Sequence, residues 1–132
     1  MQETNTTGSE QEKFWTGAFG SEYTARNAVM PELRKPFWER IYGKLDGIGS
    51  VCELGANRGH NLAALKAIDS SVMLTGVEIN ADACKIMETI PGVHTVHSSI
   101  LDFAPSERFD FVFTCGVLIH VDPNELHVFT AR

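Results

Sequence analysis

The sequence predicts a three-layer α/β sandwich, in which a parallel sheet lies between layers of helices. Two observations predict this fold. Apolar segments typical of buried strands alternate with segments of helical periodicity. The first strand, from Ser50, runs directly into a glycine-containing turn that opens a helix. Ligands of such sheets bind at the carboxyl ends of the strands, so functional residues are expected there.

The elements are expected in a fixed order along the chain. Pro31 is a good first helical residue because its missing N–H loses no hydrogen bond, although Pro36 is an alternative start, and Gly47 and Gly49 end this helix. Asp122 and the proline after it predict the start of a last helix that runs to the C-terminus. The other predicted segments are helices over 10–19, 58–68 and 81–89 and strands over 50–56, 72–79, 94–100 and 109–115.

Composition limits the classes of partner. The chain has 132 residues, 43% of them hydrophobic, and a formal net charge of −6, which is typical of one globular domain without a basic surface. Nucleic acid and anionic membranes are therefore not expected partners. The polar N-terminus resembles no signal peptide and no apolar run is long enough to span a membrane, so we expect a cytoplasmic protein.

Cysteine and histidine spacing predicts no metal site. Cys52, Cys84 and Cys115 form no Cys-x-x-Cys pair and lie in apolar segments, so we expect them to be reduced and buried. His94 and His97 are three residues apart on a predicted strand and would point to opposite faces of the sheet.

The turn after the first strand carries the strongest functional signal. Residues 53–59 read Glu-Leu-Gly-Ala-Asn-Arg-Gly, and glycines at a strand-to-helix turn let a nucleotide-like ligand lie against the backbone. Asn57 stands where a dinucleotide-binding fingerprint needs its middle glycine, which disfavours a pyrophosphate and hence a nicotinamide dehydrogenase. Glu53 repels phosphate but can accept hydrogen bonds from a cationic amine.

Later strand ends add a consistent set of residues. Glu78 ends the second predicted strand, where an acid binds both ribose hydroxyls of a nucleotide. Read alone, Glu78 could equally be a solvent-exposed acid. Ser99 follows the third predicted strand, and the fourth ends in Cys115-Gly116-Val117.

The pattern Glu-x-Gly-x-x-x-Gly over 53–59 resembles motif I of class I S-adenosylmethionine (SAM) methyltransferases, and residues 109–120 resemble their motif IV. Over nearly the whole chain the sequence looks most like the pseudaminic acid biosynthesis-associated methylases. This resemblance implies a Rossmann-like sheet of order 3-2-1-4 that lacks the last strands of the seven-stranded methyltransferase fold. It also implies an N-terminal lid over residues 1–30 and a SAM-binding domain over 31–132.

The resemblance also implies roles for individual residues. In the lid, Trp15 and Tyr23 would pack on SAM and Arg26 would bind its carboxylate, although core packing of both aromatics is equally compatible with the sequence. Ser99 stands where many relatives have Asp, which leaves its adenine contact open, with Asp102 as an alternative. The predicted cofactor-binding residues are Trp15, Tyr23, Arg26, Glu53, Gly55, Ala56, Asn57, Gly59, Asn61, Glu78, Ile79, Ser99, Ile100, Cys115, Gly116 and Val117.

The implied function is transfer of a methyl group from SAM to a small, sugar-derived acceptor, with S-adenosylhomocysteine as product. His120 is the candidate general base, against the more common alternative of a packing histidine. The alternative function is a SAM-binding module, or a truncated methyltransferase, without activity of its own. Because the fourth strand would be an apolar sheet edge, we also expect a homo-oligomer formed by this strand or by an exchanged C-terminal helix.

Overall fold

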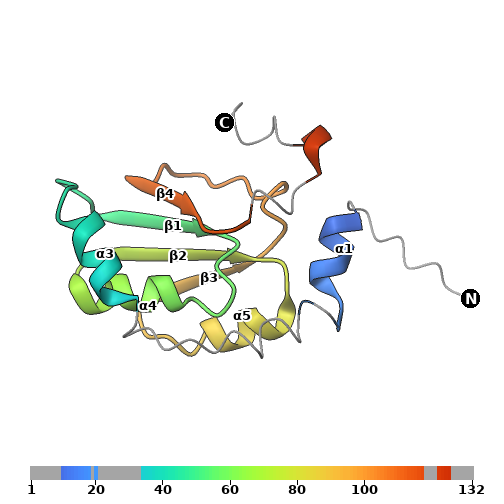
Figure 1. The fold of residues 1–132 in the computed structure, drawn as a ribbon, viewed down its shortest axis with the longest axis horizontal. Helices are drawn as coiled ribbons and strands as arrows, with labels where there is room; N and C mark the ends of the chain where they lie inside the picture. The colour runs from blue at the N-terminus through green and yellow to red at the C-terminus, as the bar shows by residue number, and fades with distance from the viewer. Residues whose placement is uncertain (1–9, 19, 21–33, 118–121, 126–132) are drawn as a thin grey trace, which may run out of the picture.

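The computed structural model of the protein describes residues 10–18, 20, 34–117 and 122–125. The elements alternate along the chain as predicted, and four strands form one sheet with helices packed against it (Figure 1). In chain order they are α1 (Glu10–Thr16), α3 (Lys35–Tyr42), β1 (Ser50–Leu54), α4 (His60–Ile68), β2 (Met73–Glu78), α5 (Ala81–Met87), β3 (Val93–His97), β4 (Phe111–Thr114) and the 3-10 helix η3 (Pro123–Glu125).

The sheet has the predicted topology. All its pairings are parallel and its order is β3-β2-β1-β4, which confirms the order 3-2-1-4. Glu53 in β1 pairs with Gly76 in β2 and with Phe113 in β4, while Glu78 at the end of β2 pairs with His97 in β3. The C-terminal ends of the strands therefore lie together on one side of the sheet, which we call its carboxyl edge, and α1 lies beyond these strand ends (Figure 1).

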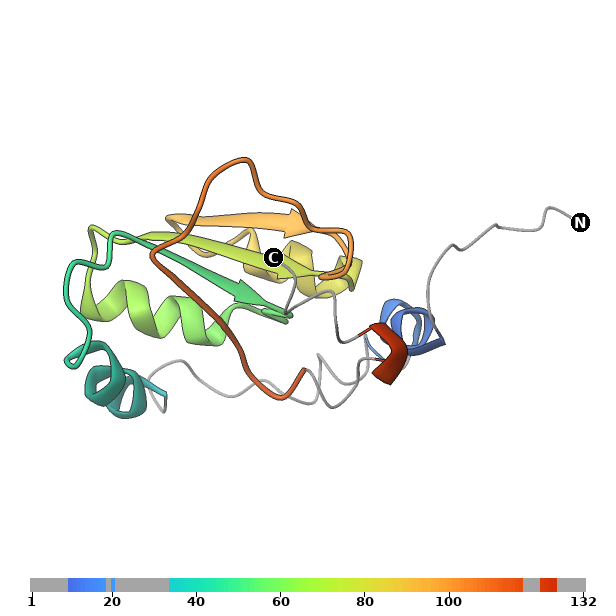
Figure 2. The ribbon, with the colours of Figure 1, turned by 90° about the horizontal axis from the view of Figure 1, so that it is seen from above.

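One hydrophobic cluster joins the helices to the sheet. Helix α4 packs on α3 and β2, and α5 packs on β2 and β3; Figure 2 shows the arrangement from above. Gly76 lets α4 and α5 approach β2 closely, because a Cβ there would lie 2.3 Å from Met87 Sδ and 2.9 Å from Leu62 Cδ1. The buried members of this cluster are Trp38, Val51, Ala56, Leu62, Ala64, Leu65, Val72, Leu74 and Met87.

Helix α3 is shorter than the pattern predicts. It begins at Lys35 with Pro36 in its first turn, so the alternative start is confirmed. It ends at Tyr42 and not near Gly47, because the amides of Lys44 and Leu45 donate to Ile41 O and Tyr42 O, three residues back, at 3.0 and 3.1 Å, and so no longer continue the α-helical pattern. The strands are also shorter than predicted: each ends before its predicted last residue, β2 and β4 begin later than predicted, and β3 begins one residue earlier, at Val93.

Asp110 fixes the start of β4 beside β1. Its Oδ2 accepts hydrogen bonds from the Gly49 and Ser50 amides at 2.8 and 3.1 Å, and its own N–H donates to Ser50 Oγ at 3.0 Å. The expected N-cap at Asp122 is present, because its Oδ1 accepts from the Asn124 amide at 3.0 Å. Residues 126–132, where the last helix is predicted to continue, lie outside the described residues.

The cysteines are only partly as expected. Cys52 and Cys84 are buried free thiols, but Cys115 is exposed, so its predicted burial is wrong. Cys115 follows the end of β4 and precedes Gly116, whose φ of 68° turns the chain out of the sheet. Among the helices of the described residues, none is long and apolar enough to cross a membrane.

Candidate functional site

The turn after β1 is built so that backbone lies close to neighbouring strand ends. Gly55 adopts a φ of 75°, and the amides of Gly55 and Ala56 donate to Val77 O at 2.8 and 3.0 Å. A Cβ on Gly55 would lie 2.5 Å from Val117 Cγ2. The left-handed φ and this contact both require glycine at position 55. The structure thus brings the predicted site residues after β1 and β4 together.

Asn57 stands in the turn at the place of the middle glycine of a dinucleotide fingerprint. It adopts a left-handed φ of 52°, which asparagine tolerates better than most residues, and its N–H donates to Glu78 Oε1 at 2.8 Å. This amide, which a pyrophosphate would need, is directed at a carboxylate instead. In this geometry the turn does not offer the Asn57 amide to a phosphate.

Glu78 is a buried carboxylate held by backbone amides. It is 9% exposed, and its second oxygen, Oε2, accepts from the Asn80 N–H at 2.8 Å. Burial raises the pKa of Glu78 above its ordinary value, against the opposing effect of the amides of Asn80, Asn57 and Ile79. Each carboxylate oxygen can accept more than one hydrogen bond, so the fixed carboxylate can still accept from a pair of hydroxyls.

Glu53 is more deeply buried than Glu78, and only one of its two carboxyl oxygens has a hydrogen-bond partner in the described residues. It is 2% exposed, its Oε2 accepts from Asn61 Nδ2 at 2.9 Å, and its Oε1 is a buried oxygen with no hydrogen-bond partner in the described part of the chain. Burial raises the pKa of Glu53 to about 8, although the Asn61 hydrogen bond and the Arg34 charge lower it. A buried acceptor without a donor is rare in native proteins and is a reasonable place for a ligand donor.

Asn61 connects Glu53 to helix α3. Its Oδ1 accepts from Arg34 Nη1 at 2.9 Å and from Trp38 Nε1 at 3.0 Å, and its Nδ2 donates to Glu53. Two donors on one oxygen fix the orientation of the amide, which in turn fixes the carboxylate. Sequence reasoning selected Asn61 but missed Arg34 and Trp38, because nothing local to α3 indicates that it contacts the turn after β1.

The end of β3 meets a carboxylate from α1. Ser99 is 9% exposed; its Oγ accepts from the Leu101 N–H at 3.1 Å and donates to Glu12 Oε1. A second hydrogen bond, from Asn80 Nδ2 to Trp15 O at 3.1 Å, holds α1 at the end of β2. Trp15 is half-buried and its ring packs edge-on against Phe14. Sequence reasoning missed Glu12 and Asn80.

The remaining predicted residues fall into two groups. Gly59, Ile79, Ile100, Cys115, Gly116 and Val117 all lie in the loops that follow the strands. Tyr23, Arg26 and His120 lie outside the described residues, as does much of the predicted lid over residues 1–30. Among the residues that the structure describes, no group of three His, Cys, Asp or Glu side chains could hold a metal ion.

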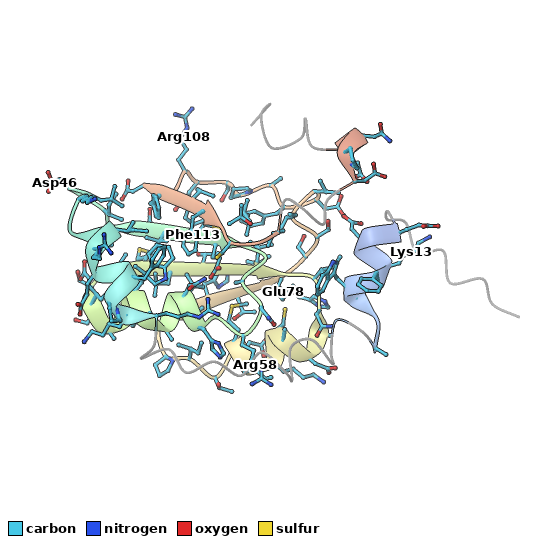
Figure 3. All side chains as sticks on the ribbon, viewed as in Figure 1. Lys13, Asp46, Arg58, Glu78, Arg108 and Phe113 are labelled. Carbon is cyan, nitrogen blue, oxygen red and sulfur yellow. The ribbon has the colours of Figure 1, made fainter. Side chains whose placement is uncertain are left out.

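Taken together, the carboxyl edge of the sheet presents acceptors at successive strand ends. Glu53 is the last residue but one of β1, Glu78 is the last residue of β2, and Ser99 with Glu12 lies after β3. Figure 3 shows Glu78 between the strand ends and helix α1. Such an edge suits a ligand that carries an amine, a ribose diol and a base along its length, and does not suit a phosphate.

Comparison with known proteins gives structural matches only. The sequence matches no protein-family model and no curated protein. Among solved structures, the glycopeptide N-methyltransferase MtfA complexed with SAM matches with a TM-score of 0.63 and 16% identity, over 80% of this chain and 49% of that one. The plantazolicin methyltransferase BpumL in complex with SAH matches with a TM-score of 0.56 and 15% identity, over 79% of this chain and 44% of that one.

A third match is CalS10, an amino pentose methyltransferase from Micromonospora echinaspora, with a TM-score of 0.55 and 17% identity, over 75% of this chain and 42% of that one. The chain thus spans less than half the length of these three proteins. At such identities the likeness establishes the fold. The described part of the chain has the Rossmann-like fold of these methyltransferases.

Proposed function

We propose that the protein binds SAM along the carboxyl edge of its sheet and transfers the SAM methyl group to a small-molecule acceptor. The observation that carries the proposal is the pair of buried carboxylates, Glu53 and Glu78, at the ends of adjacent strands. SAM has an ammonium group and a ribose diol for these two acceptors and no phosphate for them to repel. The SAM and SAH complexes of MtfA and BpumL, which share the fold, support the same ligand.

The residues present fit such a ligand. Glu53 offers a buried oxygen, Oε1, that has no partner in the described residues. A cationic donor there would satisfy this oxygen and would favour the ionised form of the carboxyl group, whose pKa burial otherwise raises to about 8. Glu78 is fixed by backbone amides and would accept from the two ribose hydroxyls. Gly55 keeps the turn free of a side chain where Val117 approaches it. The predicted contacts of Tyr23 and Arg26 with the ligand remain part of this proposal.

In this reaction the sulfonium supplies the activated methyl group, and the protein supplies position. Glu53 and Glu78 would fix two separated points of the donor, while the loop at 115–117 would border the side that an acceptor approaches. His120 remains our candidate base, if the acceptor atom needs one. We propose a sugar-derived acceptor. The resemblance to the pseudaminic acid biosynthesis-associated methylases supports it, as does the fold likeness to an amino pentose methyltransferase.

We also propose a cytoplasmic location and self-association of the chain. Copies of the chain would associate through β4 or through the segment after η3. In the described residues, β4 pairs with β1 at one edge of the sheet, and its Val112 is 49% exposed. An apolar strand of this kind favours pairing with another strand.

Calorimetry tests the ligand. We expect S-adenosylhomocysteine to bind and NAD not to bind, because the Asn57 amide, which a pyrophosphate would need, donates to Glu78 instead. Tighter binding of NAD than of S-adenosylhomocysteine would contradict the proposal. Methyl transfer from labelled SAM to amino sugars and nonulosonic acids then separates an active methyltransferase from a SAM-binding module, which would bind the cofactor without turnover.

A further inference from the structure

Helix α1 is held over the ends of two strands by hydrogen bonds from both. The Ser99 hydroxyl donates to Glu12 Oε1, and Asn80 Nδ2 donates to Trp15 O at 3.1 Å. Lys13, by contrast, lies on the side of α1 away from the sheet (Figure 3). The face of α1 that carries Glu12 is therefore the face turned to the carboxyl edge of the sheet.

The Ser99 hydroxyl can donate a single hydrogen bond, and it donates this bond to the Glu12 carboxylate. The same oxygen accepts from the Leu101 N–H at 3.1 Å, which fixes the hydroxyl in place. Ser99 is 9% exposed, so this is a largely buried support for the carboxylate. The carboxylate beside the end of β3 therefore comes from α1, and Glu12 precedes Ser99 by 87 residues in the sequence.

The order of the strands determines which part of a ligand meets Glu12. Because β1, β2 and β3 are neighbours in the sheet, Glu53, Glu78 and the Ser99–Glu12 pair follow one another along its edge. A nucleoside whose ribose is bound at Glu78 and whose amine is bound at Glu53 must direct its base toward the end of β3. The base thus reaches the side of the site where Glu12 stands.

We propose that Glu12, held by Ser99, is the residue that selects adenine, by accepting a hydrogen bond from its 6-amino group. This inference rests on the proposed SAM site. A carboxylate only accepts hydrogen bonds, so it attracts an amino group and repels the 6-oxo group of hypoxanthine. Glu12 would then determine specificity for the base without touching the reacting atoms.

Calorimetry with two ligands tests the role of Glu12. The ligands are S-adenosylhomocysteine and S-inosylhomocysteine, which differ in the group at position 6 of the base and in the hydrogen that the inosyl ligand carries on the adjacent N1. We expect the wild-type protein to prefer the adenosyl ligand by about 10-fold or more, the usual effect of one hydrogen bond to a charged group. In Glu12→Gln the amide oxygen can still accept from Ser99 while its NH₂ donates to the 6-oxo group, so this preference should fall about 10-fold.

Two further variants complete the test. Glu10→Gln makes the same charge change on an exposed residue of the same helix and should keep the wild-type preference. Ser99→Ala removes the support of Glu12 and should reduce the preference. An unchanged ratio of affinities in Glu12→Gln, or tighter binding of both ligands, would overturn the role of Glu12. Failure of the wild-type protein to bind S-adenosylhomocysteine would instead overturn the SAM site itself.

Discussion

Glu53→Gln should change how the stability of the ligand-free protein depends on pH. Glu53 is 2% exposed and burial raises its pKa to about 8. A carboxyl whose pKa is higher in the folded than in the unfolded state favours folding while it is protonated. This contribution is complete below the unfolded pKa and is lost as the pH rises through the folded pKa. The wild-type protein should therefore lose stability between about pH 4.5 and pH 8 through this residue.

The size of the effect follows from the two pKa values. With an ordinary value of 4.5 and a folded value of about 8, linkage gives a loss on the order of 4 kcal/mol between roughly pH 5 and pH 9. Glutamine does not titrate, and any fixed penalty for its buried amide is the same at every pH. The free energy of unfolding of Glu53→Gln relative to wild type should thus rise by about this amount over the same interval.

Urea denaturation at several pH values measures this difference. Other titrating groups contribute equally to both proteins and cancel. Glu107→Gln is the matched control, because it makes the same chemical change on an exposed side chain. If Glu53→Gln and wild type lose stability in parallel from pH 5 to pH 9, Glu53 is not buried in the way described.

Three other substitutions test neighbouring features. Glu78→Ala should weaken S-adenosylhomocysteine by about 1.5–3 kcal/mol, the usual loss for hydrogen bonds to a charged group, and an unchanged dissociation constant in a folded variant would remove Glu78 from the site. Gly55→Ala should destabilise the protein by about 1–3 kcal/mol, because the new methyl group would meet Val117 and the backbone has a left-handed φ; a thermal midpoint equal to wild type would contradict this. Asn61→Leu should lower the free energy of unfolding by about 2–4 kcal/mol, because it leaves buried donors and Glu53 unpaired; a loss below about 1 kcal/mol would show that the network is dispensable.

Local sequence patterns were sufficient to locate the four strands, because the apolar runs that form β1 to β4 and the glycine turn after β1 depend on residues close in sequence. The order of the strands came from the resemblance to methyltransferases, and it is confirmed. Element ends were predicted less well, as for α3, which ends early where the Lys44 and Leu45 amides bond to carbonyls three residues back, a change that a periodic pattern does not contain.

The polar network around the candidate site could be predicted only in part. Glu53 and Glu78 were identified because they stand at strand ends beside the glycine turn. The partners Arg34 and Trp38 of Asn61, and the contact of Glu12 with Ser99, join segments far apart in sequence. Such pairs are set by tertiary packing, and a single sequence carries no spacing signal for them.

A crystal structure of the complex with S-adenosylhomocysteine would show whether the ligand lies along the carboxyl ends of the strands. We expect the ribose hydroxyls within hydrogen-bonding distance, about 2.5–3.0 Å, of the Glu78 carboxylate, and the amino group of the ligand directed to Glu53. A ligand bound away from the carboxyl ends of β1 and β2, or one whose ribose does not contact Glu78, would contradict this expectation.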